Sequence, residues 1–376
     1  MQSKNAFGIR CIAKIVSVAG LLGAASFLPV AASTADIAAD AQAQALKTWH
    51  ATMRQMAPPT TGCFHAAFPS VIWERSTCEA TSYRSNPHVK LSTAETVGNG
   101  NDYAAATSNL TGSATGSFPV VTGVTSETDG TTANSYTLQL NTNLANSSPA
   151  CGSYGYASCQ VWEQFIYSSS YVGGVAQVFM QDWMFIPRKA RCPRSGGWTS
   201  YKTSSYNGCY KNSNAVNTSM VPATQLANLK LAGTVVANGN DTVTFTNGTT
   251  AYAVSEPDTT LGIAYVWNQS EFNIVGNGGG SAATFNSGSS ITVNLKVNDG
   301  STNAPSCLSN AGSTGETNNL NLGSCSAVGG TSPYIQFTES NCSLHAATRS
   351  TGYWMNQNAE GLAPLGVFIP APAINQ

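Results

Sequence analysis

Polar side chains of the kind that catalyse proton transfer lie among aromatic residues in three short segments of this chain. The segments are 161–167 (VWEQFIY), 179–185 (FMQDWMF) and 267–273 (WNQSEFN). Each combines a carboxyl group, which takes up and releases protons, with an amide, which orients water through hydrogen bonds. Polar groups in such surroundings are typical of a cleft that binds an extended ligand. Taken singly, each is more simply an ordinary outward-facing strand residue.

Patterns of better-known catalytic and metal sites are missing from the sequence. It contains no GxSxG nucleophile elbow and neither a CxxC nor an HExxH metal-binding spacing. The four histidines are His50, His65, His88 and His345, and no local sequence around them supports a serine-protease triad. The sequence therefore predicts neither a metal ion nor an organic cofactor.

Glu163 and Gln164 are adjacent in the first segment, so in a strand their side chains point to opposite faces. Trp162 lies on the face of Gln164, whereas Phe165 lies on the face of Glu163. Only one of the two polar side chains can therefore contact a ligand bound on a given face.

The elements that position these residues are predicted to be strands. Only 9% of residues are charged and 35 are glycine, a composition that favours strands and turns. Asn247-Gly248 lies between two strand-like runs, which is a strong hairpin signal. We expect an all-β antiparallel sandwich of the concanavalin-like or jelly-roll type, preceded by a short helical segment. The clearest strand patterns cover residues 134–141, 161–168, 175–185, 242–245, 250–254 and 291–297.

The first 32 residues have the parts of a secretory signal peptide. Lys4, Arg10 and Lys14 precede an apolar run over 15–30, and small residues follow it at 31–33. The run is short for a membrane span, so we expect a secreted protein, extracellular or periplasmic, without a membrane anchor. The net charge of −1 gives no reason to expect nucleic acid as a partner, and we expect a monomer.

Cysteine spacing in an exported chain indicates disulfides. Of the ten cysteines, Cys11 leaves with the signal peptide, so 10 − 1 = 9 remain and one thiol is left over. The predicted near pairs are Cys63/Cys78, Cys151/Cys159 and Cys192/Cys209, and Cys307, Cys325 and Cys342 compete for a fourth bridge.

Residues 33–95 differ in composition and sequence pattern from the rest of the chain. The stretch 35–56 is rich in Ala, Gln and Leu and predicts a helix, which Pro58 ends, and a cystine-closed unit follows at 62–80. Two interpretations stay open: a pro-segment that is removed, or a cap packed permanently on the domain. We expect the β-sandwich to cover 96–350, with a C-terminal strap or tail at 351–376.

Four short motifs follow one another within roughly residues 97–300. They are Ser113–Val121 (SATGSFPVV), Cys159-Gln160 followed by Gln164, Asp182-Trp183 with Pro187, and Ala264–Glu271 with a Gly/Asn-rich loop and Phe285 behind it. In this order they resemble the strands of the glutamic peptidases of the eqolisin type. Plant neprosin-type glutamic peptidases, also secreted, are similar more loosely.

The resemblance implies the roles of six residues. Glu271 would be the general base that activates water, and Gln164 would orient this water and stabilise the oxyanion. Asp182 would be a supporting carboxyl group that tunes the pKa of Glu271. The resemblance also implies secretion with an activation segment, no cofactor, and activity at acidic pH. The substrate groove would be lined by Trp162, Trp183 and Trp267.

The sequence thus supports a secreted endopeptidase that hydrolyses peptide bonds with a Gln/Glu pair and an activated water. An alternative from another class is a non-catalytic β-sandwich that binds glycans or a surface partner, because tryptophan and tyrosine on strands also suit sugar stacking.

Overall fold

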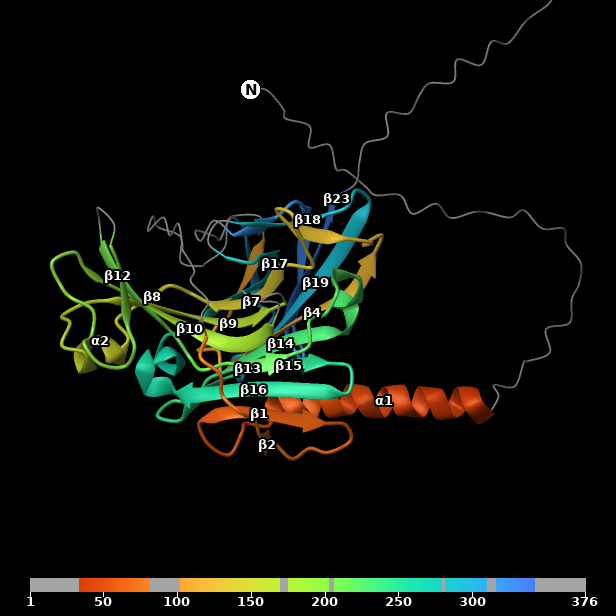
Figure 1. The fold of residues 1–376 in the computed structure, drawn as a ribbon, viewed down its shortest axis with the longest axis horizontal. Helices are drawn as coiled ribbons and strands as arrows, with labels where there is room; N and C mark the ends of the chain where they lie inside the picture. Colours follow the sequence, from red (N-terminus) through yellow and green to blue (C-terminus); the bar gives the residue numbers. More distant parts are fainter. Residues whose placement is uncertain are drawn as a thin grey trace, which may run out of the picture. The chain divides into compact units, whose positions relative to one another are not determined.

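About half of the described residues form strands, as the alternating patterns predict. The computed structural model describes residues 34–81, 102–169, 175–202, 206–278, 281–309 and 316–341. The predicted signal peptide, Cys342 and the C-terminal segment 351–376 lie outside these residues. Figure 1 shows the arrangement of the labelled elements.

One sheet has nine strands and contains the N-terminal strands of the described chain. In spatial order it consists of β2 (Glu74–Arg75), β1 (Gly62–Ala67), β16 (Thr250–Pro257), β15 (Asn240–Asn247), β14 (Leu229–Thr234), β4 (Ser113–Thr122), β19 (Ser289–Asn298), β23 (Tyr334–Asn341) and β22 (Asn321–Val328). All its neighbouring strands are antiparallel.

A second, ten-stranded sheet contains the three segments that suggested chemistry. Its main path is β11 (Thr199–Lys202), β12 (Tyr206–Asn212), β10 (Ala176–Pro187), β9 (Gln160–Ser168), β7 (Tyr136–Thr142), β17 (Gln269–Gly276), β3 (Tyr103–Ala106) and β20 (Ser306–Ser309). Beside this path, β13 (Val216–Thr218) pairs with β10 and β8 (Ala145–Asn146) pairs with β9.

A small third sheet and short helices complete the described fold. The sheet runs β21 (Thr317–Asn318), β18 (Ala282–Phe285), β5 (Glu127–Asp129) and β6 (Thr132–Ala133), with β18 and β21 parallel. The helices are α1 (Thr34–Gln55), α2 (Pro149–Ser153), and the 3-10 helices η1 (Ala223–Asn228), η2 (Asp258–Thr260) and η3 (Ile263–Tyr265). Within the described residues, no helix combines the length and apolarity that a membrane span needs.

The two large sheets pack face to face through aromatic side chains. Tyr167 of β9 stacks on Phe245 of β15 with ring centroids 4.1 Å apart. A Cβ on Gly233 of β14 would come within 2.4 Å of the Phe165 ring, so glycine is needed where this strand meets β9. Phe165 and Tyr167 therefore point into the core of a β-sandwich, and the all-β prediction is confirmed.

Helix α1 packs on the outer face of the nine-stranded sheet, next to β1 and β16 (Figure 1). Trp49 and Met53 of α1 are buried together with Phe64 of β1 and Ala253 of β16. The Trp49 indole also donates a 2.6 Å hydrogen bond to the carbonyl oxygen of Ser70. The predicted helix at 35–56 is confirmed, and β1 adds a strand to the sandwich through its pairing with β16.

Local signals for the hairpin and the near disulfides are also confirmed. Strands β15 and β16 form a hairpin in which Asn247 pairs with Thr250 and Gly248 has a φ of +55°. Such a positive φ favours glycine. Four disulfides join Cys63–Cys78, Cys151–Cys159, Cys192–Cys209 and Cys307–Cys325.

Candidate functional site

Gln164 and Glu271 lie on the outer face of the ten-stranded sheet, on strands β9 and β17. The next residue of each strand, Phe165 or Phe272, points toward the nine-stranded sheet, where Phe272 packs on Phe118 with ring centroids 5.1 Å apart. Because side chains alternate along a strand, Gln164 and Glu271 point the other way. The two residues share a face and are separated by one strand, β7.

Asn141 of β7 connects the two side chains. It pairs in register with Gln164 on one side and with Glu271 on the other. Its Nδ2 donates to Glu271 Oε2, and its Oδ1 accepts a 3.1 Å hydrogen bond from Gln164 Nε2. A continuous hydrogen-bonded path therefore runs from Gln164 to Glu271 across three adjacent strands.

Trp183 of β10 fixes the orientation of the Gln164 amide. Its Nε1 donates hydrogen bonds of 3.2 Å to Gln164 Oε1 and 3.0 Å to Gln181 Oε1. An indole N–H can only donate, so the amide oxygen of Gln164 faces Trp183 and its NH₂ group faces Asn141. Trp162 stacks on Trp183 with ring centroids 5.8 Å apart and excludes water from this end of the path.

Asp102 supplies a second carboxyl group beside Glu271. The two side chains are hydrogen-bonded, and both are buried. Burial, and then the neighbouring Asp102, raise the pKa of Glu271 well above its usual value, while the Asn141 hydrogen bond lowers it. Burial raises the pKa of Asp102 to about 6. Two carboxyl groups this close hold a proton between them over part of the pH range.

Asp182, predicted to support Glu271, lies on the opposite face of the sheet. It pairs in register with Glu163 of β9 and points between the two large sheets, where Lys211 Nζ is 3.3 Å from Asp182 Oδ2. The structure thus does not bring Asp182 to Glu271, and Asp102 occupies the neighbouring position instead. The prediction that Glu163 faces away from Gln164 holds in this geometry.

Trp267, predicted to line a groove, is in the core between the sheets. Its ring centroid is 5.9 Å from that of Phe165, and its Nε1 donates a 2.9 Å hydrogen bond to the carbonyl oxygen of Gln269. It precedes β17 in the turn after η3, where the alternation of a strand does not apply. Of the three predicted tryptophans, only Trp162 and Trp183 lie on the face of Gln164.

Two residues of this constellation, Asn141 and Asp102, were not singled out in the sequence. Asn141 is at the end of the strand predicted over 134–141. Alternation assigns it to one face of this strand but does not specify which residues of neighbouring strands it contacts. Asp102 directly precedes β3, in a stretch without a distinctive pattern. Only the pairing of β7 and β3 with β17 brings both side chains to Glu271.

The site is closed in this structure. Gln164 and Glu271 are each 2% exposed, and Trp162 and Trp183 are at most 1% exposed. A polypeptide can reach Glu271 only if this face opens. Burial also keeps the hydrogen-bonded path dry, which strengthens the interactions within it.

Comparison with known proteins adds a weak structural similarity. No protein-family profile and no curated protein matches the chain. The crystal structure of scytalido-glutamic peptidase with a transition state analog inhibitor is similar over 65% of this chain and 98% of the other, with 12% identity and a TM-score of 0.21. Because the superposition is this weak, the function of the site has to be argued from its own geometry.

Proposed function

We propose that this protein is a secreted endopeptidase in which Gln164 and Glu271 activate a water molecule to hydrolyse peptide bonds. The observation that carries the proposal is the path Gln164–Asn141–Glu271 on one face of the ten-stranded sheet. It supplies an oriented amide and a carboxyl group on neighbouring strands, which is the pair that amide hydrolysis requires.

Glu271 and Gln164 together supply the catalytic group for each step of the reaction. Glu271, when ionised, takes a proton from the attacking water as this water forms its bond to the scissile carbonyl carbon. The Gln164 N–H that donates to Gln139 Oε1 in the closed site turns to the oxyanion of the tetrahedral intermediate, a hydrogen bond worth about 3 kcal/mol. Glu271 then returns the proton to the departing amine. Asn141 holds the two side chains in place, and none of these steps needs a cofactor.

The ionisation of the Asp102–Glu271 pair sets the pH range of this mechanism. Glu271 acts as a base only in its ionised form, and burial and the neighbouring Asp102 raise its pKa well above the usual value of a glutamate. We therefore expect the acid limit of activity above the usual titration range of a glutamate, whereas the family resemblance implies activity at lower pH. Secretion is supported by the four disulfides, which persist in oxidising compartments.

A glycan-binding module is the alternative, and no observation favours it. Sugar stacking needs aromatic faces that are open to solvent. Trp162, Trp183 and Trp267 are all buried, and their ring faces are occupied by other side chains of the domain.

Cleavage of a denatured protein substrate between pH 3 and 8 tests the proposal, with serine-, cysteine- and metallo-protease inhibitors present. We expect inhibitor-resistant cleavage that falls about a hundredfold in Gln164→Ala and at least as far in Glu271→Gln. Glu127→Gln is the matched control, because it also removes a buried carboxyl group but lies in β5.

The outcomes separate cleanly. Cleavage that survives in both site variants assigns the reaction to other residues. If folded wild-type protein does not cleave the substrate, even after limited proteolysis to open the site, the peptidase function is excluded. The non-catalytic binding module is then the favoured function.

A further inference from the structure

A cluster of charged side chains lies between the two large sheets, on the opposite side of β9 from Gln164. Glu163, Asp182 and Lys211 are in register on the adjacent strands β9, β10 and β12. Asp241 and Glu256 face them as a register pair on β15 and β16. The cluster therefore joins three strands of one sheet to two strands of the other.

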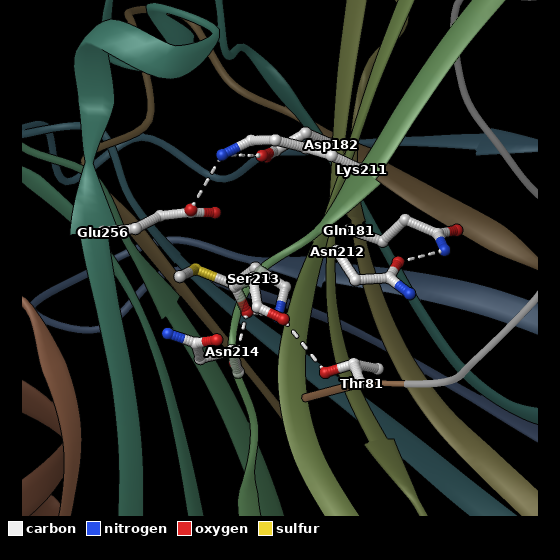
Figure 2. Close-up of polar contacts among 9 residues, drawn as sticks. Thr81, Gln181, Asp182, Lys211, Asn212, Ser213, Asn214 and Glu256 are labelled. Carbon is white, nitrogen blue, oxygen red and sulfur yellow. Dashed lines mark hydrogen bonds and ion pairs between the residues drawn. The ribbon is translucent and has the colours of Figure 1, made fainter. Parts of the chain in front are cut away.

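Lys211 is a single cation among several carboxyl groups. Figure 2 shows its ammonium group between two carboxylates, 3.3 Å from Asp182 Oδ2 and 3.1 Å from Glu256 Oε2. Asp241 and Asp258 are buried nearby and interact electrostatically with this pair. One ammonium group cannot neutralise so many carboxylates, so burial of the cluster requires further positive charge or protons.

Glu163 has no partner for its carboxyl group. It is 1% exposed, and neither of its oxygens has a hydrogen-bond partner. Asp241 Oδ1 and Glu256 Oε1 are also buried without a partner. Buried polar atoms are nearly always satisfied, and an isolated buried carboxylate is costly. Several unsatisfied oxygens at one place therefore indicate a missing ligand.

The spacing of these oxygens fits a bound metal ion. One oxygen each from Glu163, Asp182 and Glu256 lies within 4.8 Å of the others. Oxygens on opposite sides of a calcium ion are separated by about 4.8 Å, since each Ca–O bond is about 2.4 Å.

We propose that Glu163, Asp182 and Glu256 bind one calcium ion that links the two sheets of the sandwich. All three ligands are carboxylate oxygens, which select hard cations over zinc or copper. Water completes the coordination shell, and Asp241 and Asp258 add negative charge around it. Glu256 and Lys211 are partly exposed, so the ion enters from their side. The site is structural and independent of the proposed peptidase reaction.

The test is metal content and calcium-dependent stability of the purified protein. We expect about one calcium per chain by elemental analysis before chelation. After treatment with EDTA, saturating calcium should raise the Tm by about 5 °C at neutral pH. Magnesium should have a smaller effect, because it demands stricter octahedral geometry, and zinc should have none.

Two glutamate variants locate the ion. Glu163→Gln should abolish the calcium-induced rise in Tm, while Glu127→Gln, an equally buried carboxyl group in β5, should keep it. The proposal is wrong if wild-type protein carries no calcium and its Tm does not respond to calcium. It is also wrong if Glu163→Gln binds calcium as wild type does. Because metal content is measured on wild type, poor folding of the variant does not obscure the result.

Discussion

At the scale of single residues, the candidate site is defined by what each polar atom faces. Trp183 fixes the oxygen of the Gln164 amide, and Asn141 takes one of its N–H groups. Asn141 in turn donates one of its own N–H groups to Glu271 Oε2. The orientation of the proposed oxyanion donor is thus set before substrate arrives, which is the property that makes such donors effective.

Asp102 should control the pH dependence of the proposed reaction. Its charge and its hydrogen bond both raise the pKa of Glu271, so Asp102→Asn should lower that pKa. Glu271 would then ionise at lower pH, and the acid limb of kcat/KM against pH should move down by about one unit.

The control for this shift is Asp40→Asn, an exposed aspartate on α1. Its pH profile should coincide with that of wild type. An acid limb that stays in place in Asp102→Asn, or moves to higher pH, would mean that another group limits the rate.

At the scale of elements, α1 and β1 belong to the nine-stranded sheet and not to the proposed site. Six residues of β1 pair with β16, and Cys63–Cys78 closes the loop behind this strand. The helix lies on the outer face of the nine-stranded sheet, while Gln164 and Glu271 are on the outer face of the other sheet. Loss of α1 and β1 would therefore uncover apolar surface of the nine-stranded sheet without uncovering Gln164 and Glu271.

Trp49→Ala should separate stability from activity. Trp49 is buried against the sheet, so its removal should lower the free energy of unfolding by about 3 kcal/mol, measured by urea denaturation. Cleavage per folded molecule should not change, because the site is on the other sheet. Ile37→Ala, at an exposed position of the same helix, should change stability by less than about 0.5 kcal/mol. A loss of cleavage in folded Trp49→Ala would show that α1 acts on the site.

At the scale of the whole molecule, many carboxyl groups are buried in a chain with only 18 acidic residues. Away from the proposed calcium ligands, burial raises the pKa of Glu127 and of Glu339 to about 8. In the unfolded chain such groups titrate near pH 4. Between these values the folded protein binds more protons than the unfolded one.

Stability should therefore be greatest in acid. The contribution of these groups is fully present below pH 4 and is lost as the pH rises toward 8. In EDTA, which removes any contribution of calcium, we expect the free energy of unfolding to fall by on the order of 3 kcal/mol between pH 4 and 8. Urea denaturation at each pH measures this, and Glu127→Gln should flatten the curve. A urea concentration at the unfolding midpoint that rises between pH 4 and 8 would contradict the expected loss of stability.

The sequence by itself determined the structural features that depend on residues close together in the chain. A period of two places Glu163 and Gln164 on opposite faces, the low content of charged residues with many turn formers indicates β-structure, and Asn247-Gly248 marks a hairpin. Disulfides between cysteines close in sequence were predictable for a similar reason. The fourth bridge was not, because three cysteines competed for it.

Tertiary structure decided which strands are neighbours. It placed β7 between β9 and β17, so that Asn141 joins Gln164 to Glu271, and it brought Asp102 rather than Asp182 to Glu271. It also moved Trp267 into the core and gathered the carboxyl groups of the proposed calcium site from both sheets. Strand order and register result from contacts between distant parts of the chain, and local alternation specifies the face of a residue but not its partners.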